Sequence, residues 1–133
     1  MEMFVNIDVP DLELGARFYV TAFGLRVGRR LADWGLELLG AGVPIYLLAN
    51  GEGSSPFHGA VQVRQYDRHW TPVHLDFPVS NLSAALATAE AAGAQRESEV
   101  SEHAWGRMVL LSDHFGHGVC ILELNAQGYD RPV

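Results

Sequence analysis

Apolar and polar residues alternate at the start of the chain, in the pattern of a β-strand with one buried face. Within residues 3–9, the odd-numbered positions hold Val5, Ile7 and Val9, and the even-numbered positions hold Phe4, Asn6 and Asp8. Because alternate residues of a strand point to opposite faces, we expect the odd-numbered set to pack in a core and the even-numbered set to face away from it.

A helix and three short strands are predicted next. Asp11 is a good N-cap for a helix that runs to about Phe23, and Gly24 follows as a C-terminal cap. Three β-rich runs come after it, and we assign strands to residues 25–31, 34–39 and 43–49. The first fifty residues therefore predict one βαβββ module.

The same order of elements returns after residue 70. An offset of 70, which lays Phe4 on His74, also pairs Asp11 with Asn81. A second helix follows Asn81 and closes at Gly93, and strands are predicted over residues 72–79, 95–102, 107–112 and 119–124. This internal repeat predicts an α+β fold built from two βαβββ modules. Each sheet has only one helix to cover it, so each module needs the other module to complete the structure.

We expect these modules to form a single domain of 133 residues. Module one covers about residues 1–50, a linker about 51–70, module two about 71–125 and a C-terminal tail 126–133. The linker begins at the Gly-, Ser- and Pro-containing stretch 50–56. Within it, residues 61–66 are compatible with an additional edge strand.

The faces turned away from the helices carry the candidate chemistry. Strand parity puts Asn6 and Asp8 of the first module, and His74 and Asp76 of the second, on such faces. If the sheets curve together into a cup, Asp8, His74 and Asp76 would meet in one cavity. A histidine between carboxylates suits a general acid or an anion anchor, so His74 and Asp76 are our catalytic candidates. The alternative is a solvated polar sheet face.

Composition and charge exclude several classes of protein. Apolar residues make up 48% of the chain and charged residues 19%, as in a globular protein. A net charge of −7, with 9 basic against 16 acidic residues, argues against a nucleic-acid partner. No apolar run is long enough for a membrane span. The single cysteine, Cys120, excludes an intrachain disulfide, and we expect a cytoplasmic protein.

Three segments resemble a known superfamily. Val9-Pro-Asp-Leu with Phe18-Tyr19 and Phe23-Gly-Leu, Val73-His-Leu-Asp-Phe with Asn81-Leu, and Asp113-His-Phe-Gly-His-Gly-Val-Cys are similar to segments of the vicinal oxygen chelate superfamily. That superfamily includes glyoxalases, extradiol dioxygenases and bleomycin-resistance proteins. The resemblance implies the two-module fold with a cup-shaped cavity, a small-molecule partner and a homodimer.

The resemblance also implies a divalent metal bound at up to four positions, which here hold Phe4, Tyr46, His74 and Cys120. Only His74 is a usual ligand at that site. Cys120 replaces a carboxylate, a neutral tyrosine is a weak ligand, and phenylalanine cannot coordinate. Since a catalytic metal generally needs about three protein ligands, we predict no metal cofactor, with a divalent metal as the alternative.

These observations favour a small-molecule-binding protein of the bleomycin-resistance type. Its expected ligand-binding residues are Phe4, Asn6, Asp8, Tyr46, Trp70 and Cys120. The alternative is an enzyme, a glyoxalase-type lyase or isomerase or a dioxygenase-like protein, that uses His74 with a carboxylate or a non-standard metal site. A third possibility is an interaction domain whose cup is filled by side chains.

Overall fold

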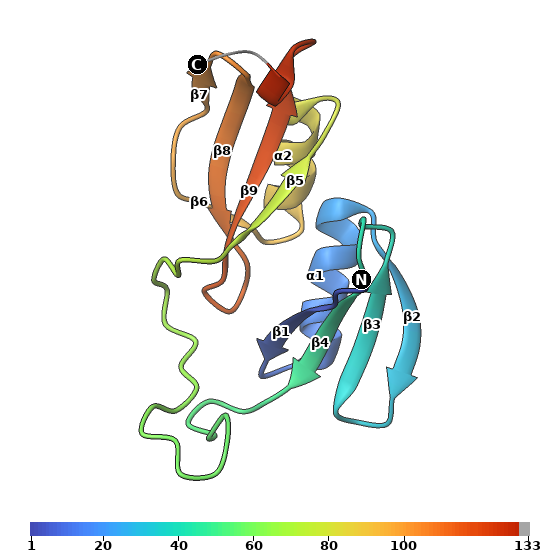
Figure 1. Ribbon diagram of the computed structural model, residues 1–133, viewed down its shortest axis with the longest axis vertical. Coiled ribbons are helices and arrows are strands. Elements are labelled where there is room, and N and C mark those ends of the chain that lie inside the picture. Colours follow the sequence, from blue (N-terminus) through green and yellow to red (C-terminus); the bar gives the residue numbers. More distant parts are fainter. Residues whose placement is uncertain (131–133) are drawn as a thin grey trace. The chain divides into compact units, whose positions relative to one another are not determined.

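The structure is a computed structural model that describes residues 1–130, and it divides into two compact units. The first unit is Met1–Asp67 and the second begins at Arg68 (Figure 1). Each unit holds one α-helix and one mixed sheet among the described residues, so the expected α+β fold with its repeated module is confirmed. The single domain and the cup shared by the two modules stay predictions. Of the predicted C-terminal tail, 126–133, the last three residues, 131–133, lie outside the described residues.

The first unit has one four-stranded sheet with a helix on one face (Figure 1). Its elements are β1 (Val5–Val9), α1 (Leu12–Phe23), β2 (Arg26–Leu31), β3 (Gly35–Leu39) and β4 (Ile45–Ala49). The strand order is β1-β4-β3-β2, with β1 and β4 parallel and the other pairs antiparallel. The core holds alternate strand residues and one side of α1, namely Ile7, Val9, Ala16, Phe18, Tyr19, Leu36, Leu38, Ile45 and Leu47. Strand parity is thus confirmed for β1.

The second unit repeats this plan. Its elements are β5 (Leu75–Pro78), α2 (Leu82–Ala91), β6 (Gln95–Arg96), β7 (Ser101–His103), β8 (Gly106–Ser112) and β9 (Gly118–Leu124), followed by a short 3₁₀ helix, η1 (Gly128–Asp130). The strand order is β5-β9-β8-β6, with β7 also paired to β8. Again the first strand pairs in parallel with the last. Pro78 is tolerated because β5 is an edge strand, where a missing N–H donor costs little.

Both helices begin at the predicted caps. Oδ1 of Asp11 accepts a hydrogen bond from the backbone N–H of Leu14 at 2.9 Å, and Oδ1 of Asn81 accepts one from Ala84 at 3.0 Å. Gly24 ends α1 in the left-handed conformation, with φ +67°, as expected of a C-terminal glycine. The positions that align at the offset of 70 therefore perform the same task in both units.

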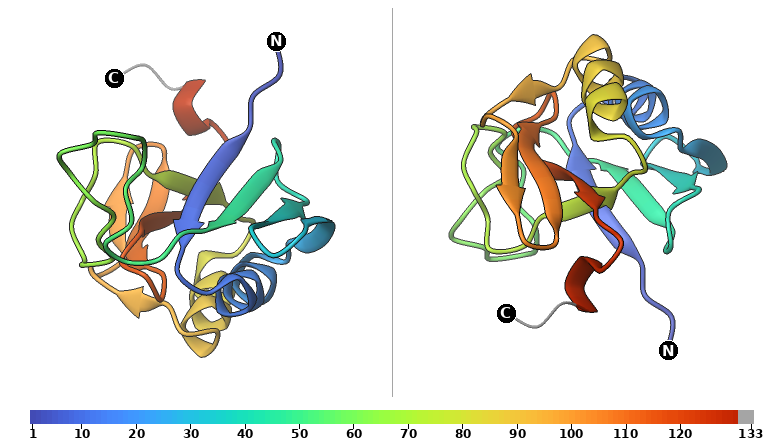
Figure 2. Two further views of the ribbon diagram at one scale, coloured as in Figure 1. Left: turned by 90° about the horizontal axis from the view of Figure 1, so that it is seen from below. Right: turned by 90° about the horizontal axis from the view of Figure 1, so that it is seen from above.

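Two strand predictions need correction. The segment 95–102 is not one strand but the two short strands β6 and β7. The hydroxyl of Ser98 accepts a hydrogen bond from the backbone N–H of Leu110, and this contact interrupts the backbone ladder. The segment 61–66 forms no strand (Figure 2). Its Arg64 instead exchanges backbone hydrogen bonds with Gly53 and Ser54, inside the same loop.

Among the described residues, neither helix combines the length and apolar character that crossing a bilayer requires.

The paired caps lead to a stability prediction. Asp11→Ala and Asn81→Ala should each lower the free energy of unfolding by about 1 kcal/mol, because each leaves helix N–H groups without an acceptor. Ser83→Ala, at an exposed position inside α2, is the matched control and should have little effect. Chemical denaturation followed by circular dichroism measures all three, and an unchanged midpoint for both cap variants would contradict the assignment.

Candidate functional site

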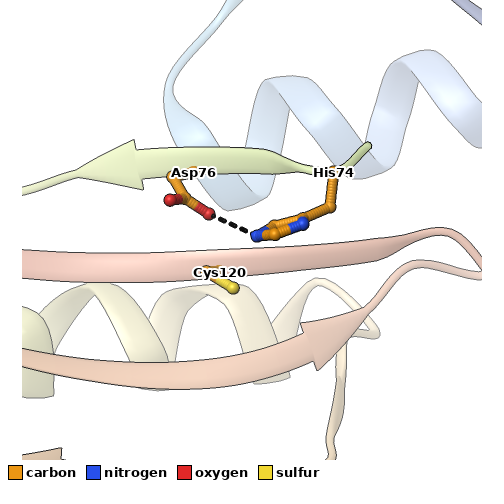
Figure 3. A group of neighbouring side chains, drawn as sticks. All are labelled: His74, Asp76 and Cys120. Atoms are coloured by element: carbon orange, nitrogen blue, oxygen red, sulfur yellow. Dashed lines mark ion pairs between the residues drawn. The ribbon is translucent and has the colours of Figure 1, made fainter. Parts of the chain in front are cut away.

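A histidine, a carboxylate and a thiol meet on the sheet of the second unit (Figure 3). Nε2 of His74 lies 3.2 Å from Oδ1 of Asp76. The sulfur of Cys120, one ring nitrogen of His74 and one carboxylate oxygen of Asp76 all lie within 4.8 Å of one another. His74 and Asp76 are exposed to solvent, whereas Cys120 is fully buried. We call these three residues the donor cluster.

The pairing of β5 with β9 creates this cluster. Asp76 and Cys120 are direct partners in the parallel register, so their side chains project from the same face. His74 precedes Asp76 by two residues and shares that face. The odd-numbered neighbours of these strands, Val119 and Ile121 among them, are buried on the opposite face with the core. Strand parity puts the three side chains on the face turned away from the helix, and the register of β5 with β9 makes them neighbours.

Cys120 is not a reactive thiolate in this setting. Burial, followed by the negative charge of Asp76 and a hydrogen bond to its carboxylate, raises the pKa of the Cys120 thiol to about 12. The thiol stays protonated at neutral pH and serves as a donor to Asp76. Asp76 thus stands between two partners, the imidazole of His74 and the thiol of Cys120.

Trp70 flanks the donor cluster. Its ring contacts that of His74 edge-on, with centroids 5.2 Å apart and an interplanar angle of 86°. The guanidinium of Arg68 lies 4.6 Å from the centre of the Trp70 ring and also pairs with Glu97. Gly118 leaves room for the indole, since a β-carbon there would lie 2.8 Å from Cζ3 of Trp70. Trp70 therefore lies beside His74, and the residue is 43% exposed.

In the first unit, side chains of the corresponding face contact one another and their neighbours. Phe4 and Tyr46 pack edge-on with ring centroids 5.4 Å apart. The hydroxyl of Tyr46 donates to Oε2 of Glu37 at 2.7 Å, and this hydrogen bond raises the pKa of Tyr46. Asn6, which is exposed, is the register partner of Tyr46 on the neighbouring strand. The phenol of Tyr46 is therefore protonated, and its hydroxyl hydrogen is already used in the hydrogen bond to Glu37.

Glu37 is a buried carboxylate that was not among the residues predicted from the sequence. Its pKa is lowered first by the hydrogen bond from Tyr46, then by the backbone N–H of Arg29. A bulge in β2 aims that N–H at the carboxylate, and Gly28 leaves room, since a β-carbon there would lie 2.4 Å from Oε1 of Glu37. A single charge within the apolar run of β3 was the signal in the sequence.

Asp8 holds the linker to the first sheet. Its Oδ2 accepts from Nε of Arg64 at 2.7 Å and its Oδ1 from the side-chain amide of Asn50 at 2.8 Å. The Tyr66 hydroxyl donates to the carbonyl of Asn50 at 2.6 Å. Both partners of Asp8 belong to the same unit, and neither was anticipated from the sequence.

The predicted site residues thus fall into two groups. The structure brings together His74, Asp76 and Cys120, with Trp70 alongside. Phe4, Asn6, Asp8 and Tyr46 belong to the first unit, where Phe4 and Tyr46 touch each other and Asp8 pairs with Arg64. Asp8 and Asp76 were both predicted as possible carboxylate partners of His74. In the structure, His74 pairs with Asp76. The catalytic and ligand-binding roles of all these residues stay predictions.

The four positions implied for a divalent metal do not fit that metal. Phe4 carries no donor atom, and the phenol of Tyr46 is protonated and bound to Glu37. The first unit therefore supplies none of the expected ligands. The remaining two, His74 and Cys120, are fewer than the three protein ligands that a catalytic metal generally requires.

Comparison with known proteins places this geometry in context. The family model of the glyoxalase-like domain matches residues 4–122. No curated protein sequence matches the chain.

Three solved structures illustrate the likeness in fold. A glyoxalase/bleomycin resistance protein/dioxygenase family enzyme from Burkholderia phytofirmans PsJN has a TM-score of 0.69 at 21% identity, covering 92% of this chain and 97% of its own. The fosfomycin resistance protein FosX from Listeria monocytogenes has a TM-score of 0.73 at 15% identity, covering 96% and 93%. Lactoylglutathione lyase from Agrobacterium tumefaciens has a TM-score of 0.65 at 17% identity, covering 92% of each chain. At such identities the likeness shows the fold alone.

The state of Cys120 gives a labelling prediction. A thiol pKa raised from 9.0 to about 12 lowers the thiolate fraction about 1000-fold, so iodoacetamide should leave the folded protein unmodified at pH 8 and modify it after unfolding. Asp76→Asn removes a carboxylate charge that raises this pKa and should speed labelling of the folded chain. Glu102→Gln, at an exposed position of β7, is the control. Mass spectrometry reads the modification, and equal rates for folded and unfolded wild-type chains would contradict the assigned pKa.

Glu37 gives a prediction about stability and pH. Because its pKa is lowered in the folded chain, the stability it contributes is fully present above its ordinary value of 4.5 and is lost as the pH falls through the lowered value. Glu37→Gln should therefore destabilise the protein at pH 7, and its difference from wild type should shrink below pH 4.5. Urea unfolding at both pH values tests this. A difference that stays constant with pH would contradict it.

Proposed function

Because this chain belongs to the glyoxalase-like domain family, we propose that it binds a small organic molecule and does so without a divalent metal at the four positions implied for the family's enzymes. The family assignment confirms the resemblance seen in the sequence. The proposal is of the bleomycin-resistance type, in which binding rather than turnover is the activity.

The observation that carries this proposal is the grouping of Trp70, His74 and Asp76. Trp70 is 43% exposed and offers an indole for stacking, and the adjacent imidazole and carboxylate offer a donor and an acceptor. A flat apolar contact beside a few oriented polar groups is the usual composition of a small-molecule site. Arg68 and Gly118 support this arrangement, because the first stacks on the indole and the second leaves space for it.

The first unit offers a second surface of mixed character. Phe4 is 57% exposed, and Asn6 beside it is also exposed. Tyr46 supports Phe4 from the neighbouring strand and is itself held by Glu37. In this proposal the aromatic rings contribute apolar contact and Asn6 contributes hydrogen bonding. Asp8 is the least available of the predicted ligand-binding residues, because Arg64 and Asn50 occupy its two oxygens.

The similar structures agree with a small organic ligand but do not identify it. One is a fosfomycin resistance protein and another is a lactoylglutathione lyase. We also propose a homodimer in the cytoplasm, on the basis of the superfamily resemblance and of the single cysteine. Sedimentation of the 14.6 kDa chain tests the dimer directly.

A second candidate function is an enzyme that transfers a proton between substrate and the His74–Asp76 pair. The 3.2 Å separation between the imidazole and the carboxylate favours it, because a carboxylate orients an imidazole for acid–base chemistry. The raised pKa of Cys120 argues against a mechanism with a cysteine nucleophile. Lyase and isomerase reactions of the glyoxalase type are the class to consider.

Binding should be measurable on protein treated with a chelator. Bleomycin, fosfomycin and lactoylglutathione form the first set of probes, and we expect at least one to raise the unfolding temperature in a concentration-dependent manner. Trp70→Ala and His74→Ala should each weaken that binding at least about tenfold, because they remove the stacking face and the polar anchor. His58→Ala, at an exposed linker position, is the matched control.

Two results would count against the binding function. Turnover of lactoylglutathione that requires an added metal would favour the enzyme. Binding that Trp70→Ala and His74→Ala leave as strong as in the control would remove the proposed site. Calorimetry with the same variants separates weaker binding from a loss of folded protein, since the active fraction is read from the stoichiometry.

A further inference from the structure

We propose that the outer edges of the two sheets pair between copies of this chain, so that β2 of one copy lies against residues 97–103 of another. Arginines line β2, which we call the basic edge, and glutamates line residues 97–103, which we call the acidic edge. This contact is independent of the proposed binding of an organic molecule. It supplies an interface for the homodimer proposed above.

Both segments are open edges of their sheets. β2 is the last strand of the first sheet and, among the described residues, pairs only with β3 (Figure 1). In the second sheet, β6 and β7 pair with β8 and, within residues 1–130, with no other strand. An edge strand keeps a row of backbone N–H and C=O groups that can pair with another chain. The two edges are equivalent in the repeat, because each follows the helix of its unit.

The charges of the two edges are complementary. Three of the six residues of β2 are arginines and none is acidic, although the whole chain has only 9 basic residues. Three of the residues 97–102 are glutamates and none is basic. The side chains concerned are Arg26, Arg29 and Arg30 on the basic edge and Glu97, Glu99 and Glu102 on the acidic edge. Two like edges would repel each other, so the favoured contact joins unlike edges.

Most of these side chains are accessible to a second copy. The side chains of Arg29 and Arg30 are 77% and 54% exposed, and Glu99 and Glu102 are exposed as well. Arg30 lies 2.8 Å from Glu13, but an ion pair between two exposed side chains adds little to stability, so partner carboxylates can compete for the guanidinium. Glu97 is the least available of the glutamates, because it pairs with Arg68.

The alternative is that the charges keep the edges unpaired. Charged side chains and bulges protect many edge strands from pairing, and β2 has both. The two explanations differ in what a reversal of charge does. If the edges pair, reversing one edge weakens association and reversing both restores it. If the charges only protect the edges, the position of a reversal does not matter.

Sedimentation equilibrium of the full-length chain tests the contact. We expect a wild-type dimer that weakens in about 0.5 M NaCl, because salt screens exposed ion pairs. Arg26→Glu with Arg30→Glu reverses the basic edge, and Glu99→Arg with Glu102→Arg reverses the acidic edge. Each double variant should associate at least about tenfold more weakly than the wild type, because like charges then face each other. All four positions are exposed, and circular dichroism establishes that each variant is folded.

Mixing the two double variants is the decisive measurement. In the mixture each reversed edge meets an edge of opposite charge, so the association constant should return to near the wild-type value. The matched control is Glu2→Arg with Glu52→Arg, which changes the net charge as much as the acidic-edge variant does but at other exposed positions. Mixed with the basic-edge variant, this control should restore association less, since one of the two edge pairings stays repulsive.

Three results would overturn the paired edges. A wild-type chain that stays monomeric contradicts both this contact and the homodimer. A dimer that neither double variant weakens contradicts the contact and leaves the homodimer standing on another surface. Equal recovery in the decisive and control mixtures shows that net charge, and not the edges, governs association. Organic binding is measured by calorimetry on other variants, so none of these results decides it.

Discussion

The parallel pairing of the first and last strands in each unit determines which side chains meet. In the first unit β1 and β4 place Asn6 beside Tyr46, and in the second β5 and β9 place Asp76 beside Cys120. A shift of one residue in either register would turn these side chains to the opposite face and expose the core residues. The apolar odd-numbered residues under each helix resist that shift, so packing of the core also maintains the position of the site.

The repeat makes the two faces directly comparable. Phe4, Asn6 and Tyr46 of the first unit stand where His74, Asp76 and Cys120 stand in the second. The first set consists of two aromatic rings and an amide, and its one titratable side chain, Tyr46, donates a hydrogen bond to Glu37. The second set has an imidazole, a carboxylate and a thiol within 4.8 Å. The same backbone geometry therefore carries two aromatic rings and an amide in one unit, and an imidazole, a carboxylate and a thiol in the other.

Periodicity predicted what depends on neighbours along the chain. Strand parity, both N-caps and the duplicated order of elements were read correctly from the sequence, because each follows from local spacing. The contacts that were missed join distant residues. Arg64 reaches Asp8 across 56 positions, and Ser98 breaks a predicted strand by accepting a hydrogen bond from Leu110. Parity put Asp76 and Cys120 each on the strand face turned away from the helix. Only the register of β5 with β9 shows that the two side chains are neighbours.

The ion pair of Asp8 and Arg64 changes which carboxylate is available for chemistry. Asp8 and Asp76 occupy similar strands, and the sequence alone offered either as the partner of His74. With both Asp8 oxygens accepting hydrogen bonds inside the first unit, a ligand would have to displace Arg64 or Asn50 to use them. Asp76 is exposed, and its partners in the second unit are the His74 ring and the Cys120 thiol. Arg64 therefore holds the Asp8 carboxylate in an ion pair within the first unit, whereas the Asp76 carboxylate lies beside His74 in the second.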